Sequence, residues 1–150
     1  MAMKNLDKQA LRSGASVALV FAVPFSVAAR WVADSDGGSE ALAAWLSLAA
    51  LAGFVLGAGV AAWVQQRRLP LMHGIICAVG TYVAAQAVFI LVRLFMGREV
   101  RWFAAVFNLT AVMVAGALGG GLGAMMHKRG LRPRSAAAAA GRAGDEQSQP

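Results

Sequence analysis

Residues 102–126 read WFAAVFNLTAVMVAGALGGGLGAMM, a run of 25 residues without an acidic or basic side chain. As an α-helix, this run is long enough to cross the roughly 30 Å of hydrocarbon in a bilayer. Five of its last 12 residues are glycine, although glycine is a poor helix former in water. The run therefore predicts a membrane helix, and its glycines need an explanation of their own.

Three more apolar runs of similar length cover about residues 13–33, 42–64 and 71–95. The chain of 150 residues is 59% hydrophobic and 14% charged, whereas a soluble domain averages roughly 25% charged residues. The runs are continuous, unlike the short alternating segments of a strand barrel. We therefore predict an all-α fold, in which residues 13–127 form a bundle of four transmembrane helices.

The basic residues predict the orientation of this bundle. Most of them lie before the first run, between the second and third runs, or after the fourth: Lys4, Lys8, Arg12, Arg67, Arg68, Lys128, Arg129, Arg132, Arg134 and Arg142. The others lie at the opposite ends of the spans: Arg30, Arg93, Arg98 and Arg101. Because basic loops are retained in the cytoplasm, this bias predicts cytoplasmic N and C termini.

The tryptophans agree with these span ends. Trp31, Trp45 and Trp102 fall at the predicted outer ends, and Trp63 falls at an inner end. Such positions are typical of the aromatic belts at membrane interfaces.

Both ends of the chain are predicted to lie outside the bundle. Residues 1–12 would form a basic cytoplasmic segment, and residues 128–150 a basic, Ala-rich cytoplasmic tail. The tail has too little apolar surface to fold alone, so we expect it to be disordered.

The first span has an alternative interpretation as a cleaved signal peptide. A basic region and an apolar stretch precede a possible cleavage site at Ser26-Val27-Ala28. The apolar stretch continues past that site to Val32, which favours a retained span. Pro24 lies near the middle of this span and is expected to kink it.

Small residues recur at four-residue spacing in the spans. In lipid, helices associate through close backbone approach rather than through apolar area, so such spacing indicates contact surfaces. We predict six helix-packing positions: Gly53, Gly57, Gly116, Gly119, Gly120 and Gly123. The fourth span would then pack on two sides, with the second span as one neighbour. The same surface could instead mediate dimerisation.

A phosphate-binding loop is a second interpretation of the same glycines. Gly119, Gly121 and Ala124 match the spacing GxGxxA of a dinucleotide fingerprint. That fingerprint follows a strand and opens a soluble helix, whereas these residues lie inside an apolar span. We therefore predict no nucleotide site and no cofactor.

Strong polar groups are few inside the spans. No Asp, Glu or Lys lies deep in any of them, which argues against a proton-coupled pump. Gln86 and Asn108 are the deepest polar residues, and on adjacent antiparallel spans they could share an interhelical hydrogen bond. The functional alternative is a polar contact in a substrate path.

Two histidines and the one cysteine form a weaker candidate cluster. His73 and Cys77 are four residues apart on one helix face, and His127 ends the fourth span on the same side. Such ligands could hold a soft metal or haem iron. Both histidines lie near the interface, however, and we expect them to face water or headgroups rather than a metal.

The segment GFVLGAGVAAWVQQRR (residues 53–68) leads through LMHGIICAVGTYV (71–83) to the closing AGALGGGLG (115–123). This pattern resembles a family of small, uncharacterised four-span prokaryotic membrane proteins. The similarity covers about residues 41–126 and implies the fold alone, because that family has no established function. The long C-terminal tail departs from it.

These observations together predict a multi-pass protein of a prokaryotic plasma membrane without enzymatic activity. It would be a structural or accessory subunit that packs against itself or a larger membrane protein. We expect no nucleic-acid partner, because the basic segments lack interleaved aromatic residues. The alternative is a channel or carrier for a small solute, whose path would be lined by Gln86, Asn108, Thr110 and Thr81.

Overall fold

The computed structural model describes residues 7–65, 69–97, 99 and 102–131. They form four α-helices in series: α1 (Lys8–Asp34), α2 (Glu40–Val64), α3 (Pro70–Phe95) and α4 (Trp102–Lys128). Each helix is long and apolar enough to cross a membrane, and the described residues contain no strand. The prediction of an all-α, four-span fold is confirmed, and the chain is a multi-pass membrane protein.

Local capping explains where the helices begin. The Asp7 carboxylate accepts hydrogen bonds from the backbone N–H groups of Gln9 and Ala10, which satisfies donors that a helix start leaves free. α1 therefore begins at Lys8, earlier than the predicted Ser13, and residues 8–12 are helical. The rest of the predicted N-terminal segment and residues 132–150 of the tail lie outside the described residues.

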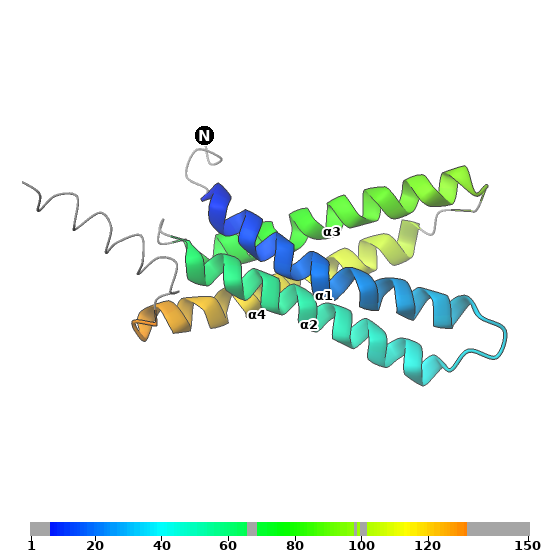
Figure 1. Ribbon diagram of the computed structural model, residues 1–150, viewed down its shortest axis with the longest axis horizontal. Helices are drawn as coiled ribbons and strands as arrows, with labels where there is room; N and C mark the ends of the chain where they lie inside the picture. The colour runs from blue at the N-terminus through cyan, green and yellow to red at the C-terminus, as the bar shows by residue number, and fades with distance from the viewer. Residues whose placement is uncertain (1–6, 66–68, 98, 100–101, 132–150) are drawn as a thin grey trace, which may run out of the picture.

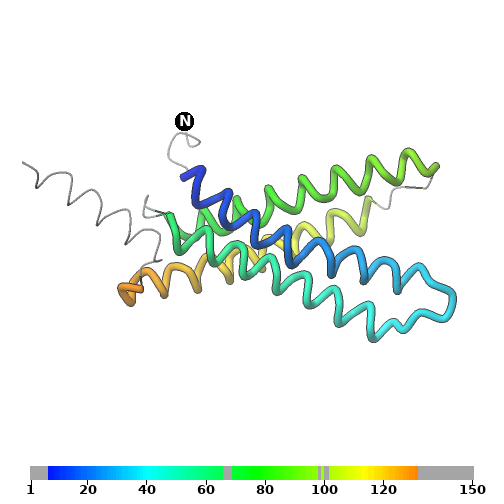
Figure 2. Tube along the Cα trace, viewed as in Figure 1, coloured from blue at the N-terminus to red at the C-terminus, as the bar shows by residue number. Residues whose placement is uncertain are grey.

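The helices form two antiparallel hairpins, α1–α2 and α3–α4 (Figure 1). The start of α1 and the end of α4 lie at the same end of the bundle, as four antiparallel helices require. The hairpins cross at this end and diverge toward the other (Figure 2). Which end faces the cytoplasm stays a prediction from the basic residues.

The buried residues gather where the hairpins cross. We call this part the closed half, and it comprises helical residues 8–22, 50–64, 70–82 and 112–128. The open half comprises helical residues 23–34, 40–49, 83–95 and 102–111, and Ala29 is the only buried residue in it. The bundle therefore has one close-packed half and one splayed half.

One face of α4 lies directly against the backbone of α2. A Cβ atom added at Gly119 would clash with the carbonyl oxygen of Val55, and one at Gly123 would lie 2.5 Å from the carbonyl oxygen of Gly59. Only residues without a side chain allow this approach, which brings two backbones into dispersion contact.

The adjacent face of α4 lies against α3 in the same way. A Cβ atom at Gly116 would lie 2.9 Å from the Cβ atom of Ala78, and one at Gly120 would lie 3.1 Å from the Cα atom of Leu71. From the other side, a Cβ atom at Gly74 would lie 2.7 Å from the Cα atom of Gly120. α4 thus contacts two helices through two glycine rows.

The glycine pair of α2 faces α1 rather than α4. A Cβ atom at Gly53 would lie 2.8 Å from the backbone nitrogen of Ala22, and one at Gly57 would lie 2.6 Å from the Cβ atom of Ala18 and 2.7 Å from the carbonyl oxygen of Gly14. The six glycines singled out from the sequence therefore all contact helices of the same chain. These surfaces are filled without a second copy.

We predict that Gly119→Ala destabilises the protein by about 1–3 kcal/mol, because the added methyl group overpacks the contact with α2. Gly121→Ala is the matched control, since a Cβ atom there meets nothing within 4 Å. It should leave stability unchanged or raise it by up to about 1 kcal/mol, the helix-propensity gain of alanine over glycine. Unfolding of both variants by SDS titration in detergent measures the difference. Equal unfolding midpoints would show that close approach at Gly119 is not needed.

Candidate functional site

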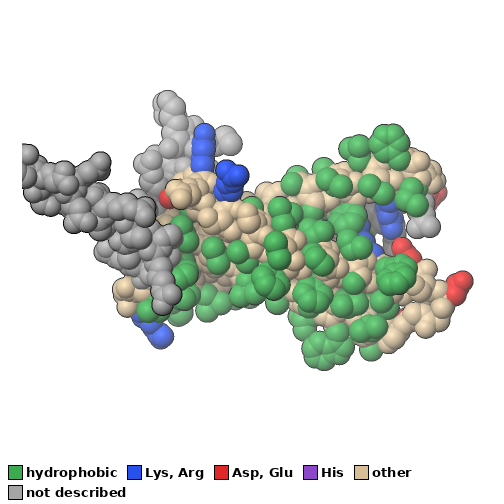
Figure 3. Space-filling model, in the orientation of Figure 1, with side chains coloured by type: hydrophobic (Ala, Val, Ile, Leu, Met, Phe, Trp, Pro, Cys, Tyr) green, Lys and Arg blue, Asp and Glu red, His purple; other side chains and the backbone are tan. Residues whose placement is uncertain are grey.

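A cleft opens between the hairpins in the open half. It consists of one cavity of about 320 Å³ and a second of about 170 Å³, and Arg30, Ala33 and Asn108 line both. We call the two cavities together the interhairpin cleft. Figure 3 shows basic side chains in the hollow between two arms whose surfaces are otherwise largely hydrophobic.

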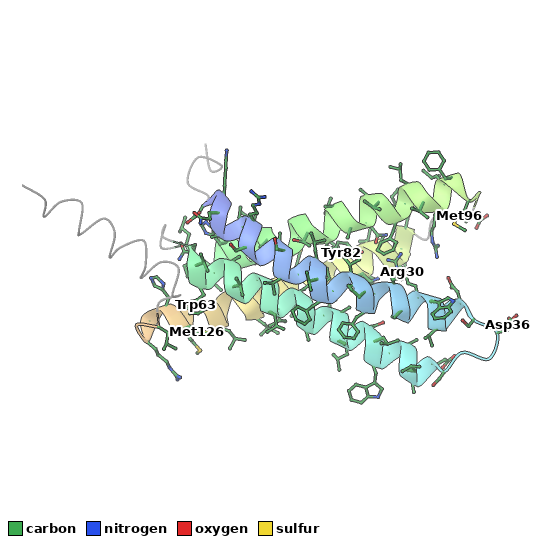
Figure 4. The ribbon with its side chains drawn as sticks, in the orientation of Figure 1. Arg30, Asp36, Trp63, Tyr82, Met96 and Met126 are labelled. Atoms are coloured by element: carbon green, nitrogen blue, oxygen red, sulfur yellow. The ribbon has the colours of Figure 1, made fainter. Side chains whose placement is uncertain are left out.

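Arg30 is the central charged residue of this cleft. It lies on α1, one turn before the helix ends at Asp34, and its side chain is partly buried. Its Nη2 atom donates a hydrogen bond of 3.1 Å to Oε1 of Gln86, and its guanidinium carbon lies 4.4 Å from the ring centroid of Phe89. Both partners belong to α3. Arg30 therefore bridges the two hairpins instead of pointing away from the bundle (Figure 4).

A second arginine lines the smaller cavity. Arg93 lies in the last turn of α3, and its Nη1 atom donates a hydrogen bond of 3.1 Å to the carbonyl oxygen of Glu99. Asp34 is the only carboxylate among the described residues that line either cavity. No ion pair within 4.0 Å joins it to Arg30 or Arg93. The lining of the cleft therefore carries an excess of positive charge.

An aromatic pair closes the cleft where the open half meets the closed half. The rings of Phe54 on α2 and Tyr82 on α3 meet edge to face, with centroids 6.2 Å apart, and both residues line the larger cavity. The Tyr82 hydroxyl donates a hydrogen bond of 2.8 Å to the carbonyl oxygen of Ala105 on α4. Three helices are thus joined at the floor of the cleft.

The predicted hydrogen bond between Gln86 and Asn108 is not the one that forms. Gln86 accepts from Arg30, while Asn108 lines the smaller cavity from α4 without a hydrogen bond to a described residue. The two residues do share this cavity. Thr81 and Thr110 do not line the cleft, because Thr81 is buried in the closed half and the Thr110 hydroxyl bonds to the carbonyl oxygen of Val106.

His73 is fully buried, so the expectation that it faces water or headgroups is wrong. Its Nε2 atom accepts a hydrogen bond of 3.0 Å from the backbone N–H of Asp7. Its Nδ1 atom therefore carries the proton, and it donates to the carbonyl oxygen of Leu69 at 2.8 Å. His73 thus ties the start of α1 to the start of α3. The sequence could not predict this role, because the hydrogen-bond partners of His73 are backbone groups.

The same contacts argue against His73 as a metal ligand, because both ring nitrogens are already hydrogen-bonded. Cys77 is buried, with Sγ 3.8 Å from the carbonyl oxygen of Leu11, and His127 is exposed. Within the described part of the chain, no three His, Cys, Asp or Glu side chains are close enough to hold a metal ion. The predicted cluster is therefore not brought together.

The fold and the cleft together define the class of this protein. It is a four-span membrane protein whose helices pack closely at one end of the bundle and leave an arginine-lined cleft at the other. Comparison with protein-family models, curated proteins and solved structures gives no match. The resemblance to small four-span prokaryotic proteins stays a prediction.

We predict that Tyr82→Phe destabilises the protein by about 1 kcal/mol, because it removes the hydrogen bond to Ala105 and keeps the ring against Phe54. Tyr82→Leu should cost more, because it also loses the edge-to-face contact. SDS unfolding of the two variants separates these contributions. If Tyr82→Phe unfolded at the wild-type midpoint, the hydroxyl would not secure the floor of the cleft.

Proposed function

We propose that this protein is a non-enzymatic accessory subunit of a prokaryotic plasma membrane, and that it acts by binding at the interhairpin cleft. The observation that carries the proposal is the contrast between the two halves of the bundle. Glycine contacts hold the closed half in one arrangement, while the open half presents Arg30 inside a cavity. A rigid support beneath a preformed cavity is the usual arrangement of a binding site.

The direction of the Arg30 side chain supports a binding role. An arginine near a helix end in a membrane usually extends outward to the headgroups. Arg30 instead extends inward to Gln86 and Phe89 on the other hairpin. Ionisable groups that face the interior of a membrane bundle are costly, and they commonly mark functional sites.

Neighbouring residues on α3 provide a test of the cleft. Ile90 lines the smaller cavity, whereas Leu91 is 56% exposed and lines neither cavity. We expect a membrane-impermeant maleimide to label Ile90→Cys and to leave Leu91→Cys unlabelled, because thiolates form in water and not in lipid. The wild-type protein sets the baseline, since its one cysteine, Cys77, is buried.

The side from which the reagent reacts also tests the orientation. If both termini are cytoplasmic, Ile90→Cys should be labelled from outside intact cells. Labelling from the cytoplasmic side alone would reverse the predicted topology. Equal labelling of Ile90→Cys and Leu91→Cys, or of neither, would refute a water-accessible cleft and with it the proposed function.

A carrier is the second candidate, and the closed floor of the cleft favours it. A polar cleft that is open at one end and sealed at the other has the form of one state in alternating access. Gln86 and Asn108 would contribute to the path, as their shared cavity suggests. Thr81 and Thr110 are no longer candidates for its lining.

Flux into liposomes distinguishes a carrier from an accessory subunit. For a carrier, we expect solute-selective flux that Asn108→Leu abolishes, because this change removes a polar group from the cleft. Thr110→Val is the control, since Thr110 lies outside both cavities. Flux that persists in Asn108→Leu, or no flux at all, would exclude this path and leave the accessory role.

A further inference from the structure

We infer that the interhairpin cleft binds an anionic amphiphile, whose phosphate or carboxylate group contacts Arg30 and whose hydrocarbon chain occupies the larger cavity. The inference rests on the proposed function, because it names the ligand class of the same cleft. Four observations carry it: the hydrogen bonding of Arg30, the charge of the smaller cavity, the apolar lining of the larger one, and the position of Arg30 between them.

The Arg30 guanidinium has room for an anion. It carries five N–H donors, and its one hydrogen bond to a described residue is the bond to Gln86. No carboxylate within 4.0 Å neutralises it in the described part of the chain. A partly buried guanidinium with unused donors favours a bidentate oxyanion, which supplies both the missing charge and two acceptors.

The smaller cavity adds to this preference. Arg93 lines it from α3 and Asp34 from α1. Together with Arg30, this places two positive groups and one negative group in its lining. Gln86 and Asn108 complete its polar wall. A zwitterionic headgroup would bring a further positive charge to a site that already has an excess, so the cleft selects a net anion.

The larger cavity suits a hydrocarbon chain. Its volume of about 320 Å³ is at the lower end for ligand sites. Beyond Arg30, its walls are mainly small and apolar, including Ala29, Ala50 and Val112, and it ends at Phe54. Since Arg30 lines both cavities, one molecule can place its charged group at Arg30 and its chain below.

Native mass spectrometry of the full chain tests the charge part of the inference. The protein is released from micelles that contain equimolar phosphatidylglycerol and phosphatidylcholine. We expect wild type to retain phosphatidylglycerol preferentially, and Arg30→Gln to lower that retention about tenfold, the effect of one lost charge-assisted contact. Arg12→Gln is the matched control, because Arg12 is exposed at the other end of α1 and should leave retention unchanged.

Two further arms test the chain and the source of the anion. Ala44→Phe fills the larger cavity, which Ala44 lines, and should abolish lipid retention while Arg30 stays in place. Decyl phosphate should displace phosphatidylglycerol at concentrations where inorganic phosphate does not. Equal displacement by inorganic phosphate would identify a free anion as the ligand and overturn the amphiphile. Full retention in Ala44→Phe would show that no hydrocarbon chain occupies the larger cavity, which would also overturn the inference.

The remaining outcomes are also decisive. Equal retention of the two lipids by wild type, or equal losses in Arg30→Gln and Arg12→Gln, would refute a specific anion site. If Arg30→Gln unfolds in detergent, Arg30→Lys is used in its place. Lysine keeps the positive charge but lacks the paired N–H donors of the guanidinium, so retention of phosphatidylglycerol should fall only partly. If lipid binding fails while Ile90→Cys is still labelled, this inference alone is refuted. If that labelling fails, the proposed function is refuted.

Discussion

Close backbone contact between α4 and its two neighbours holds this bundle together. Lipid supplies no hydrophobic force between helices, so attraction depends on how many atoms come within dispersion distance. The rows through Gly116 and Gly119 remove the side chains that would keep α3 and α2 away. Because the two rows lie on adjacent faces, one helix fixes the positions of two others. α1 is then added through the glycine pair of α2.

The splayed half follows from the place where these rows end. The glycines of α4 are confined to residues 116–123, and no glycine lies in the earlier part of the helix, where Ala104, Ala105 and Asn108 line the smaller cavity. Helices that touch closely at one level and cross at an angle must separate with distance from the contact. The cleft is thus a geometric consequence of close glycine contact at only one end of α4.

The sequence predicted the features that depend on pattern. Length and hydropathy gave the four helices, because both are properties of single segments. The sequence did not identify Arg30 as a cleft residue. Because Arg30 lies near the end of a span, it contributed only to the charge bias, and the neighbouring residues in the sequence do not show whether its side chain points into the bundle. Its partner Gln86 lies on another hairpin, so the contact exists only after the helices have packed. The hydrogen bonds of His73 to backbone groups could not be predicted for the same reason, because they also form only after the helices have packed.

The polar links that His73 and Arg30 make between α1 and α3 differ in what they allow. His73 joins the helices in the closed half through backbone groups, where the glycine contacts leave no room to move. Arg30 joins them in the open half through side chains alone, and Gln86 is a neutral acceptor that a stronger anionic acceptor can replace. If the inferred anion takes Arg30 from Gln86, the hairpins lose a link where no glycine contact supports them. Occupancy of the cleft and the separation of the hairpins would then be coupled through this one side chain.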